Sequence, residues 1–207
     1  MNPKININKY SEGINFLSKD DILGPHINRI SPPKYSLDQD FFESLCKYII
    51  FQQLSIKSAS KTYNRFKKLI KNIKPEIILK TNNEHIRNTG VSNKKIEYLK
   101  ELSTSFIENK NYEFLKSKKD NEIIEILSKI KGIGSWTAEM FLIFTMGRLD
   151  VFSAKDIGLL NALKIVYKLD YRPSFEEANL LSKRWSPFKT IASLYLWKII
   201  DGGDLDW

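Results

Sequence analysis

The residues Leu127-Ser-Lys-Ile-Lys-Gly-Ile-Gly-Ser-Trp-Thr-Ala138 join two helical segments through the hairpin Gly132-Ile133-Gly134. The segment 120–131 is amphipathic, and the segment 135–146 is almost wholly apolar. Glycine permits backbone angles that other residues avoid, and it lets a ligand approach the main chain. The first N–H groups of the second helix have no partner within that helix and can bind an anion. The pattern predicts a hairpin that holds a phosphate or, with no ligand, a plain corner between two helices.

The rest of the chain continues this helical pattern. From residue 38 onward, apolar residues recur at three- and four-residue spacing, which indicates helices that bury one face. The first is expected between a candidate N-cap, Asp38, and Leu54. Others are expected at 56–70, from 75 to about 81, and at 85–89, 92–107, 111–115, 154–168, 174–184 and 187–201. No segment alternates with a period of two, so we predict an all-α fold, in which residues 1–37 form a packed arm with at most short helices.

Charge and cysteine content narrow the class of protein. The chain has 207 residues, with 33 Lys and Arg against 24 Asp and Glu, and its net charge of +9 favours a polyanionic partner: nucleic acid or an anionic membrane surface. The single cysteine, Cys46, excludes an intrachain disulfide and a four-cysteine iron–sulfur cluster. No apolar run reaches the ~18 residues of a membrane span, and no signal peptide precedes the first helix. We therefore expect a soluble intracellular protein.

A second motif follows the hairpin: Asp150-Val-Phe-Ser-Ala-Lys-Asp156-Ile-Gly-Leu. Asp156 stands where the next helix begins, which is a common place for an N-capping aspartate. A carboxylate there can also stabilise positive charge that develops in a reaction, and it can deprotonate an attacking water. The two roles are compatible, because backbone N–H donors keep a capping carboxylate ionised.

Three further segments, in order, carry the resemblance to a family. They are Ile49-Ile-Phe-Gln-Gln-Leu-Ser-Ile-Lys-Ser-Ala59, Arg87-Asn-Thr-Gly-Val-Ser-Asn-Lys-Lys-Ile-Glu-Tyr-Leu99 and Arg184-Trp-Ser-Pro-Phe-Lys-Thr-Ile-Ala-Ser-Leu-Tyr-Leu-Trp197. With the hairpin and the Asp156 motif, they span roughly residues 41–199. The set resembles the helix-hairpin-helix DNA glycosylases, in the branch of the DNA-3-methyladenine glycosylase II (alkylbase) enzymes.

The resemblance implies one domain over residues 1–207, with two helical lobes and the active site in the cleft between them. One lobe would hold about 46–150, and the other about 1–45 with 151–207. An N-glycosylase must flip its nucleotide out of the stack to reach the glycosidic bond. The resemblance assigns Gln53, with Leu54 beside it, to the space left in the stack, and Asp156 to catalysis. For the glutamine pair, the alternative is a polar helix end that faces solvent.

Trp136 indicates the type of reaction. It stands two residues after the second hairpin glycine, where the strand-cleaving relatives carry a lysine that forms a Schiff base. With no amine at that position, we expect a monofunctional enzyme that releases the base without cutting the strand. An indole face also attracts a cationic alkylated base. The resemblance implies a base pocket lined by Trp136, Trp197, Tyr195 and Phe51, although Tyr195 is equally compatible with the core and Phe51 departs from the small residue of relatives.

Contacts to the DNA backbone are the last part of the resemblance. It implies phosphate binding by Gly132, Gly134 and Thr137, and we expect Lys94 and Lys95 to add further contacts. It also implies that the backbone carbonyls of Ser128, Ile130 and Ile133 hold a monovalent cation, Na⁺ or K⁺. No cofactor is required, and none of the iron–sulfur type is expected.

The expected function is excision of alkylated purines, of the 3-methyladenine and 7-methylguanine type, as the first step of base excision repair. The expected partner is double-stranded DNA that holds damaged bases, with no membrane and with the protein as a monomer. The location would be the cytoplasm and nucleoid of a prokaryote or the nucleus of a eukaryote. Two alternatives stay open: a non-catalytic DNA-binding protein, and a glycosylase for oxidised or deaminated bases.

Overall fold

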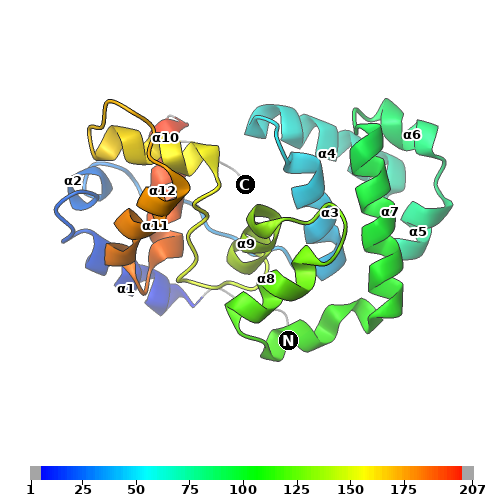
Figure 1. The fold of residues 1–207 in the computed structure, drawn as a ribbon, viewed down its shortest axis with the longest axis horizontal. Coiled ribbons are helices and arrows are strands. Elements are labelled where there is room, and N and C mark those ends of the chain that lie inside the picture. Colours follow the sequence, from blue (N-terminus) through cyan, green and yellow to red (C-terminus); the bar gives the residue numbers. More distant parts are fainter. Residues whose placement is uncertain (1–5, 202–207) are drawn as a thin grey trace. The chain divides into compact units, whose positions relative to one another are not determined.

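All the elements that the structure shows between residues 6 and 201 are helices, which confirms the predicted all-α class. The computed structural model describes these residues, and 1–5 and 202–207 lie outside the description. The chain divides into two compact units. One unit consists of residues 38–141, and the other combines the chain up to residue 37 with the chain from residue 142 onward (Figure 1).

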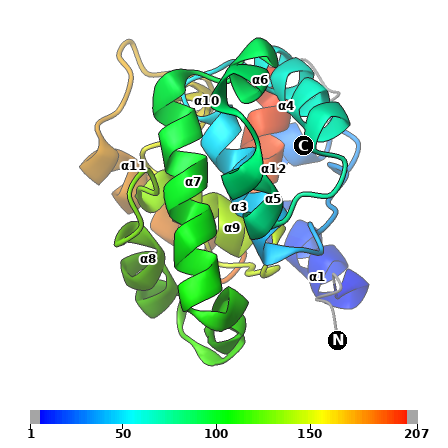
Figure 2. The same cartoon turned by 90° about the vertical axis from the view of Figure 1, so that its right-hand side faces the viewer.

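The unit of residues 38–141 is built around α3 (Phe41–Phe51) and α7 (Asn93–Glu108), which pack against each other. Figure 2 shows α7 along this unit with α5 and α6 beside it. Ring contacts fill the core: Phe42 lies 5.1 Å from Phe106, and Phe41 lies 5.0 Å from Phe141. The other elements are α4 (Ile56–Ile70), α5 (Pro75–Lys80), α6 (Asn83–Asn88), η1 (Lys110–Ser117), α8 (Asp120–Ser128) and most of α9 (Ser135–Phe144).

The second unit brings both ends of the described chain together. Its central contact joins α10 (Ile157–Val166) and α12 (Lys189–Ile200), and α1 (Ile7–Leu17) packs on α12. Trp185 and Trp197 are among its largest fully buried side chains. The remaining elements are α2 (Gly24–Ile27), α11 (Phe175–Ser182) and η2 (Lys183–Trp185).

Polar side chains at the predicted positions start several helices. The Ser92 hydroxyl accepts the N–H of Lys95 at the start of α7, and Ser174 forms a capping box with Glu177 at the start of α11. One predicted cap is wrong: α3 is capped by Asp40, which accepts the N–H of Glu43 at 2.9 Å. Asp38 instead accepts the Lys47 ammonium at 3.2 Å.

The arm of residues 1–37 differs from the prediction, because α1 is a helix of 11 residues. Gly13 lies inside α1, although glycine disfavours the interior of a helix. A Cβ atom at this position would lie 2.3 Å from Cδ1 of Ile191 and 2.8 Å from the Phe188 ring. Gly13 therefore costs some helix propensity and lets α1 approach α12 closely.

The units meet at 37/38 and 141/142, whereas the lobes were predicted to meet near 45/46 and 150/151. Phe42 packs on Phe106, so the start of α3 belongs to the 38–141 unit. At the other boundary, the Tyr35 hydroxyl donates to the carbonyl of Ile143 at 2.6 Å, and Phe144 stacks on Trp197. The end of α9 therefore belongs with the chain ends. An active site between the lobes stays a prediction.

Candidate functional site

The hairpin between α8 and α9 uses its two glycines differently. Gly132 has a φ of +92°, and a Cβ atom there would lie 2.1 Å from the Tyr98 ring, so this glycine is required by the fold. Gly134 has no positive φ, and an added Cβ would meet nothing within 4 Å. Ile130 and Ile133 are buried beneath the turn. The outer glycine therefore leaves open space over the hairpin, as the approach of a phosphate requires.

Gln52 fastens the end of α3 to the hairpin. Its side-chain Nε2 donates to the carbonyl of Gly132 at 2.8 Å and to the Thr137 hydroxyl at 2.9 Å. Thr137 is 1% exposed, so its hydroxyl serves this contact. The main-chain N–H of Thr137 is then the group left for the predicted phosphate contact, which stays a prediction. Gln52 was not predicted to have this role, although it is the first glutamine of the Gln-Gln-Leu-Ser motif.

Gln53 and Leu54 form the turn that follows. Gln53 is exposed and has a φ of +56°, a conformation that L-residues other than glycine seldom adopt. Leu54, the next residue, is 42% exposed. Strained backbone of this kind concentrates at functional sites. The turn presents a polar and an apolar side chain to solvent, as insertion into a base stack requires.

The two predicted lysines at the start of α7 differ in their contacts. The Lys95 ammonium donates to the carbonyls of Ile50 at 2.8 Å and Gln52 at 2.7 Å, and burial lowers the pKa of Lys95. Lys95 thus binds the last carbonyls of α3 with two of its three N–H groups. Lys94 is exposed and lies 5.9 Å from the centre of the Tyr98 ring, the ring that packs on Gly132. Their phosphate contacts stay predictions.

Asp156 occupies the N-cap of α10, in the other unit. One carboxylate oxygen, Oδ1, accepts the N–H of Leu159 at 2.8 Å and the indole N–H of Trp197 at 3.1 Å. The side chain is only 8% exposed. Burial, together with the nearby Asp156 carboxylate, raises the pKa of Asp201, which follows α12. Two N–H donors therefore fix the orientation of the Asp156 carboxylate.

Gly158 lies in the first turn of α10 and was not predicted as a site residue. A Cβ atom here would lie 2.9 Å from Oδ1 of Asp156, 3.2 Å from Ile200 and 3.4 Å from Trp197. Glycine inside a helix costs about 1 kcal/mol relative to alanine. That cost was a signal in the sequence, because a glycine two residues after a candidate catalytic acid calls for a spatial reason.

Three of the four aromatic residues predicted to line the base pocket are buried in the structure. Trp197 and Tyr195 are each 1% exposed, and Phe51 is 6% exposed with its ring edge against Tyr63. Phe51 and Tyr195 are buried residues, and the Trp197 indole N–H positions Asp156, so the contacts of these three rings with a base stay predictions. Trp136, in the first turn of α9, is half-buried, and its contact with a base stays a prediction.

The hairpin carbonyls suit a cation. The carbonyl of Ile130 accepts the N–H of Ile133 at 3.0 Å, which closes the turn. Among residues 6–201, no backbone donor reaches the carbonyls of Ser128 or Ile133. Because hard cations take backbone carbonyls as ligands, this donor set fits the predicted ion. No group of three or more His, Cys, Asp or Glu side chains placed to hold a metal occurs in the described part of the chain.

Residues 46–187 match the family model described as HhH-GPD superfamily base excision DNA repair protein. The chain belongs to this superfamily. The match includes the Gln53 turn, the hairpin and Asp156, and it ends before Trp197. The order of motifs in the sequence had predicted this membership, and the match confirms it.

Two relatives of this HhH-GPD protein are named as DNA-3-methyladenine glycosylases. It is 34% identical over 174 residues to the putative DNA-3-methyladenine glycosylase YfjP of Bacillus subtilis, a match that covers 80% of the chain and 61% of that relative's length. It is 36% identical over 162 residues to DNA-3-methyladenine glycosylase 1 of Schizosaccharomyces pombe, with 76% and 71% covered. The chain thus spans less than two thirds of the Bacillus relative.

A solved structure shares the fold. The 3-methyladenine DNA glycosylase Mag1 of Schizosaccharomyces pombe, in complex with abasic DNA, has a TM-score of 0.85 and 30% identity, with 92% of this chain and 97% of that chain covered.

A separate finding concerns membranes: in the part of the chain from residue 6 to 201, no helix combines the length and apolar character of a membrane span.

Proposed function

We propose that this HhH-GPD protein is a monofunctional DNA N-glycosylase that excises alkylated purines from double-stranded DNA and so starts base excision repair. The names of its relatives and the abasic DNA bound by Mag1 support this proposal. The protein would act as a monomer on one flipped nucleotide. The reaction hydrolyses the bond between base and deoxyribose and leaves an abasic site with the strand intact.

The observation that carries the proposal is the carboxylate of Asp156, held by the N–H groups of Leu159 and Trp197. As the base leaves, positive charge develops on the sugar, and a fixed carboxylate stabilises it without having to reorient. The same carboxylate can accept a proton from the attacking water. An alkylated purine is already cationic, so its departure needs no strong general acid.

The other unit supplies groups for holding DNA. Gln53 would hydrogen-bond the base left without a partner, and Leu54 would fill the remaining space in the stack. The main-chain N–H groups around Gly134 would bind phosphate, assisted by a monovalent cation on the carbonyls of Ser128 and Ile133. Trp136 would stack on the cationic base.

The decisive variant is Asp156→Asn. Asparagine is as good an N-cap as aspartate, so the start of α10 should be preserved. We expect base release under single-turnover conditions to fall by about 10²- to 10⁴-fold, with binding to a duplex that holds an abasic-site analogue retained. Release at the wild-type rate would refute the catalytic role and leave the alternative of a passive DNA-binding protein.

The substrate class is tested on the unchanged protein with duplexes that hold 3-methyladenine, 7-methylguanine, 1,N6-ethenoadenine, hypoxanthine or uracil. We expect the cationic bases to be released fastest, because Trp136 offers an electron-rich ring and no amine is present at that position. Preferential release of the neutral bases would instead support a glycosylase for oxidised or deaminated bases. Borohydride trapping of a covalent adduct would contradict the absence of lyase activity.

A further inference from the structure

The helix that follows the Gln53 turn lies in the most basic stretch of the chain. Residues 44–75 contain no Asp or Glu, and α4 lies within them. The basic residues of this stretch are Lys47, Lys57, Lys61, Arg65, Lys67, Lys68, Lys71 and Lys74. A local excess of this size creates a positive potential that the net charge of the whole chain does not describe.

The basic side chains of this stretch fall into two groups. Some have partners within the unit: Arg65 Nε donates to the carbonyl of Thr89 at 2.7 Å, and Lys67 pairs with Glu43 at 2.7 Å. Lys57, Lys61 and Lys68 are exposed, and among residues 6–201 they form neither an ion pair nor a side-chain hydrogen bond. Elsewhere in the unit, surface lysines pair with glutamates, as in Lys116–Glu113, Lys118–Glu122, Lys129–Glu125 and Lys131–Glu97.

Two of these lysines, Lys57 and Lys61, do not serve the stability of α4, whereas Lys68 lies in the last turn, where the macrodipole favours a positive charge. Lys57 and Lys61 are four residues apart on one face, where like charges repel by a few tenths of a kcal/mol. Lys57 also lies in the first turn of the helix, where the macrodipole disfavours a positive charge and where α4 has no acidic residue. The charges of Lys57 and Lys61 thus cost the fold free energy, and none of the three lysines has a partner within residues 6–201, which indicates an external partner.

The spacing of the lysines suits a nucleic-acid strand. Lys57, Lys61 and Lys68 follow one another at four and seven residues, so they form one stripe along the helix. At 1.5 Å per residue, the stripe is roughly 16 Å long. A DNA strand has one phosphate for about 3.4 Å of axis, so the stripe spans about five phosphates.

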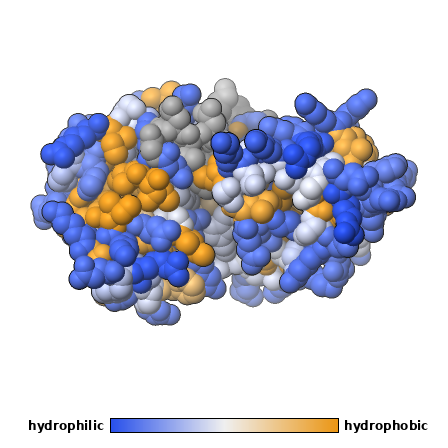
Figure 3. All heavy atoms as spheres, turned by 90° about the horizontal axis from the view of Figure 1, so that it is seen from above, coloured by the Kyte–Doolittle hydropathy of each residue, from blue (hydrophilic) through white to orange (hydrophobic). Residues whose placement is uncertain are grey.

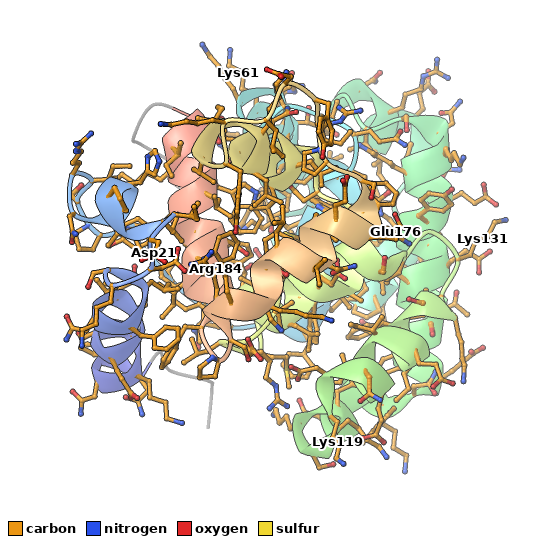
Figure 4. The ribbon with its side chains drawn as sticks, turned by 60° about the vertical axis from the view of Figure 1, so that its left-hand side comes forward. Asp21, Lys61, Lys119, Lys131, Glu176 and Arg184 are labelled. Atoms are coloured by element: carbon orange, nitrogen blue, oxygen red, sulfur yellow. The ribbon has the colours of Figure 1, made fainter. Side chains whose placement is uncertain are left out.

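The position of the stripe relates it to the site. Ser55 caps α4 directly after Gln53 and Leu54, so Lys57 is four residues from Gln53, the side chain proposed to enter the base stack. Figure 3 looks onto the side where α4 lies, and hydrophilic side chains dominate the half of the view that contains this unit. Figure 4 shows Lys61 pointing outward, at the opposite end of the view from Lys119 of the same unit.

We propose that the α4 stripe, Lys57, Lys61 and Lys68, binds the phosphate backbone of DNA on one side of the flipped nucleotide, without regard to base sequence. The proposal rests on the proposed function, because it assumes that DNA is the substrate. A membrane surface fits less well, since the apolar face of α4, with Ala59 and Phe66, is buried. A protein partner would call for aromatic or other apolar anchors among the lysines, and Leu69 is the single exposed one.

The test compares two triple variants of the full chain that remove the same charge. One is Lys57→Gln, Lys61→Gln, Lys68→Gln. The control is Lys80→Gln, Lys110→Gln, Lys119→Gln, three exposed lysines of the same unit that also have no ion pair within residues 6–201. Binding to a 25-base-pair duplex with a central tetrahydrofuran abasic analogue is measured by fluorescence anisotropy over a range of KCl concentrations.

We expect the α4 variant to reduce the slope of log K against log[KCl] by about 2 to 3, since each phosphate contact contributes about 0.9. Hydroxyl-radical footprints should lose protection over about five nucleotides on one side only. The control should keep the wild-type slope and footprint. An unchanged slope in the α4 variant, or an equal reduction in both variants, would overturn the proposal. Loss of binding to anionic lipid vesicles by the α4 variant, with its slope for DNA unchanged, would also overturn the proposal.

Base release by the wild-type protein, measured on the same preparations, separates this proposal from the proposed function. If the wild type releases 3-methyladenine and the α4 variant keeps the wild-type slope, the proposal for the α4 stripe is wrong and the proposed enzymatic function is supported. If the wild type releases no base and the slope still falls, the stripe binds DNA and the enzymatic proposal is wrong.

Discussion

The Gln53 turn consists of Gln53 and Leu54, and the Asp156 corner consists of Asp156 with Gly158 and Trp197. The two regions hold their side chains in opposite ways. Gln53 and Leu54 are exposed, and Gln53 has a φ of +56°. Asp156 is 8% exposed and accepts two hydrogen bonds on one oxygen. A side chain that enters a gap in the base stack must be accessible to DNA, whereas a carboxylate that stabilises charge must not reorient during the reaction. The difference shows how the two tasks impose different packing.

The largest effect is expected at the hairpin, where one glycine belongs to the fold and the other to the surface. Gly132→Ala would place a Cβ 2.1 Å from the Tyr98 ring at a φ of +92°, and should lower the free energy of unfolding by about 3 kcal/mol. Gly134→Ala should change it by less than about 0.5 kcal/mol. Urea denaturation measures both.

Gly134→Ala should nevertheless weaken binding to the abasic duplex, by about tenfold, because the added methyl group occupies the space a phosphate would approach. Equal stability losses in the two variants would show that the glycines do not divide these tasks. Unchanged DNA affinity in Gly134→Ala would show that the open space over the hairpin is not used.

The enclosure of the Asp156 corner is tested by Gly158→Ala. The new Cβ would lie 2.9 Å from Oδ1 of Asp156 and should displace the carboxylate from the Trp197 indole. We expect base release to fall by about 10- to 100-fold, since small misplacements of a catalytic group cost this much. Asn161→Ala, at an exposed position of the same helix, is the matched control and should release base at the wild-type rate. Wild-type release by Gly158→Ala would mean that the corner tolerates displacement.

Two adjacent glutamines provide a smaller and sharper contrast. Gln52→Ala leaves the Gly132 carbonyl and the buried Thr137 hydroxyl without a donor, and should cost about 1 to 2 kcal/mol in the free energy of unfolding. Gln53→Ala removes an exposed side chain and should cost less than about 0.5 kcal/mol. Only Gln53→Ala should weaken binding to the abasic duplex at full stability. Equal unfolding midpoints in urea would refute the division of roles.

The smallest effect concerns an ion pair that belongs to neither region. Asp20 accepts the N–H groups of Ile22 and Leu23 and pairs with Arg184 at 2.6 Å. Burial alone would raise the pKa of Asp20, but these hydrogen bonds and the guanidinium outweigh it and lower the pKa. The carboxylate therefore contributes stability above its unfolded pKa of about 3.9, and this stability is lost as pH falls through the lower folded value.

Asp20→Asn should thus reduce the free energy of unfolding by about 1 kcal/mol at pH 7. The difference from the wild type should shrink below about pH 4. Thermal or urea unfolding at several pH values measures it, and base release at pH 7 should stay at the wild-type rate. A difference that persisted undiminished at low pH would show that the contribution does not come from the charge of Asp20.

Helices and family were predictable from local patterns, because spacing and capping residues act over a few residues. Ser92 and Ser174 stand alone as caps, whereas Asp38 and Asp40 are two residues apart and only packing chooses between them. Glycine disfavours helices, and the reason for Gly13 inside α1 is its close approach to Ile191, which is far away in the sequence.

The site was predictable in its residue types and less so in their orientation. The motif contains both Gln52 and Gln53, and the positive φ of the second turns one inward and the other outward. Trp197 has the chemistry of a pocket wall, but burial directs its indole N–H to Asp156. Such assignments depend on contacts between residues 41 to 85 positions apart, which no local spacing encodes.

The indole that donates to Asp156 belongs to α12, the last helix of the described chain. This helix packs against α1, the first helix. Chains emerge from the ribosome N-terminal end first, and their parts fold as they become complete. The 38–141 unit is continuous and can form early in synthesis, whereas α1 must wait for α12 before it has a surface to pack on. During synthesis, a nascent chain could therefore hold its DNA-binding turn and hairpin in place before its reactive carboxylate is set.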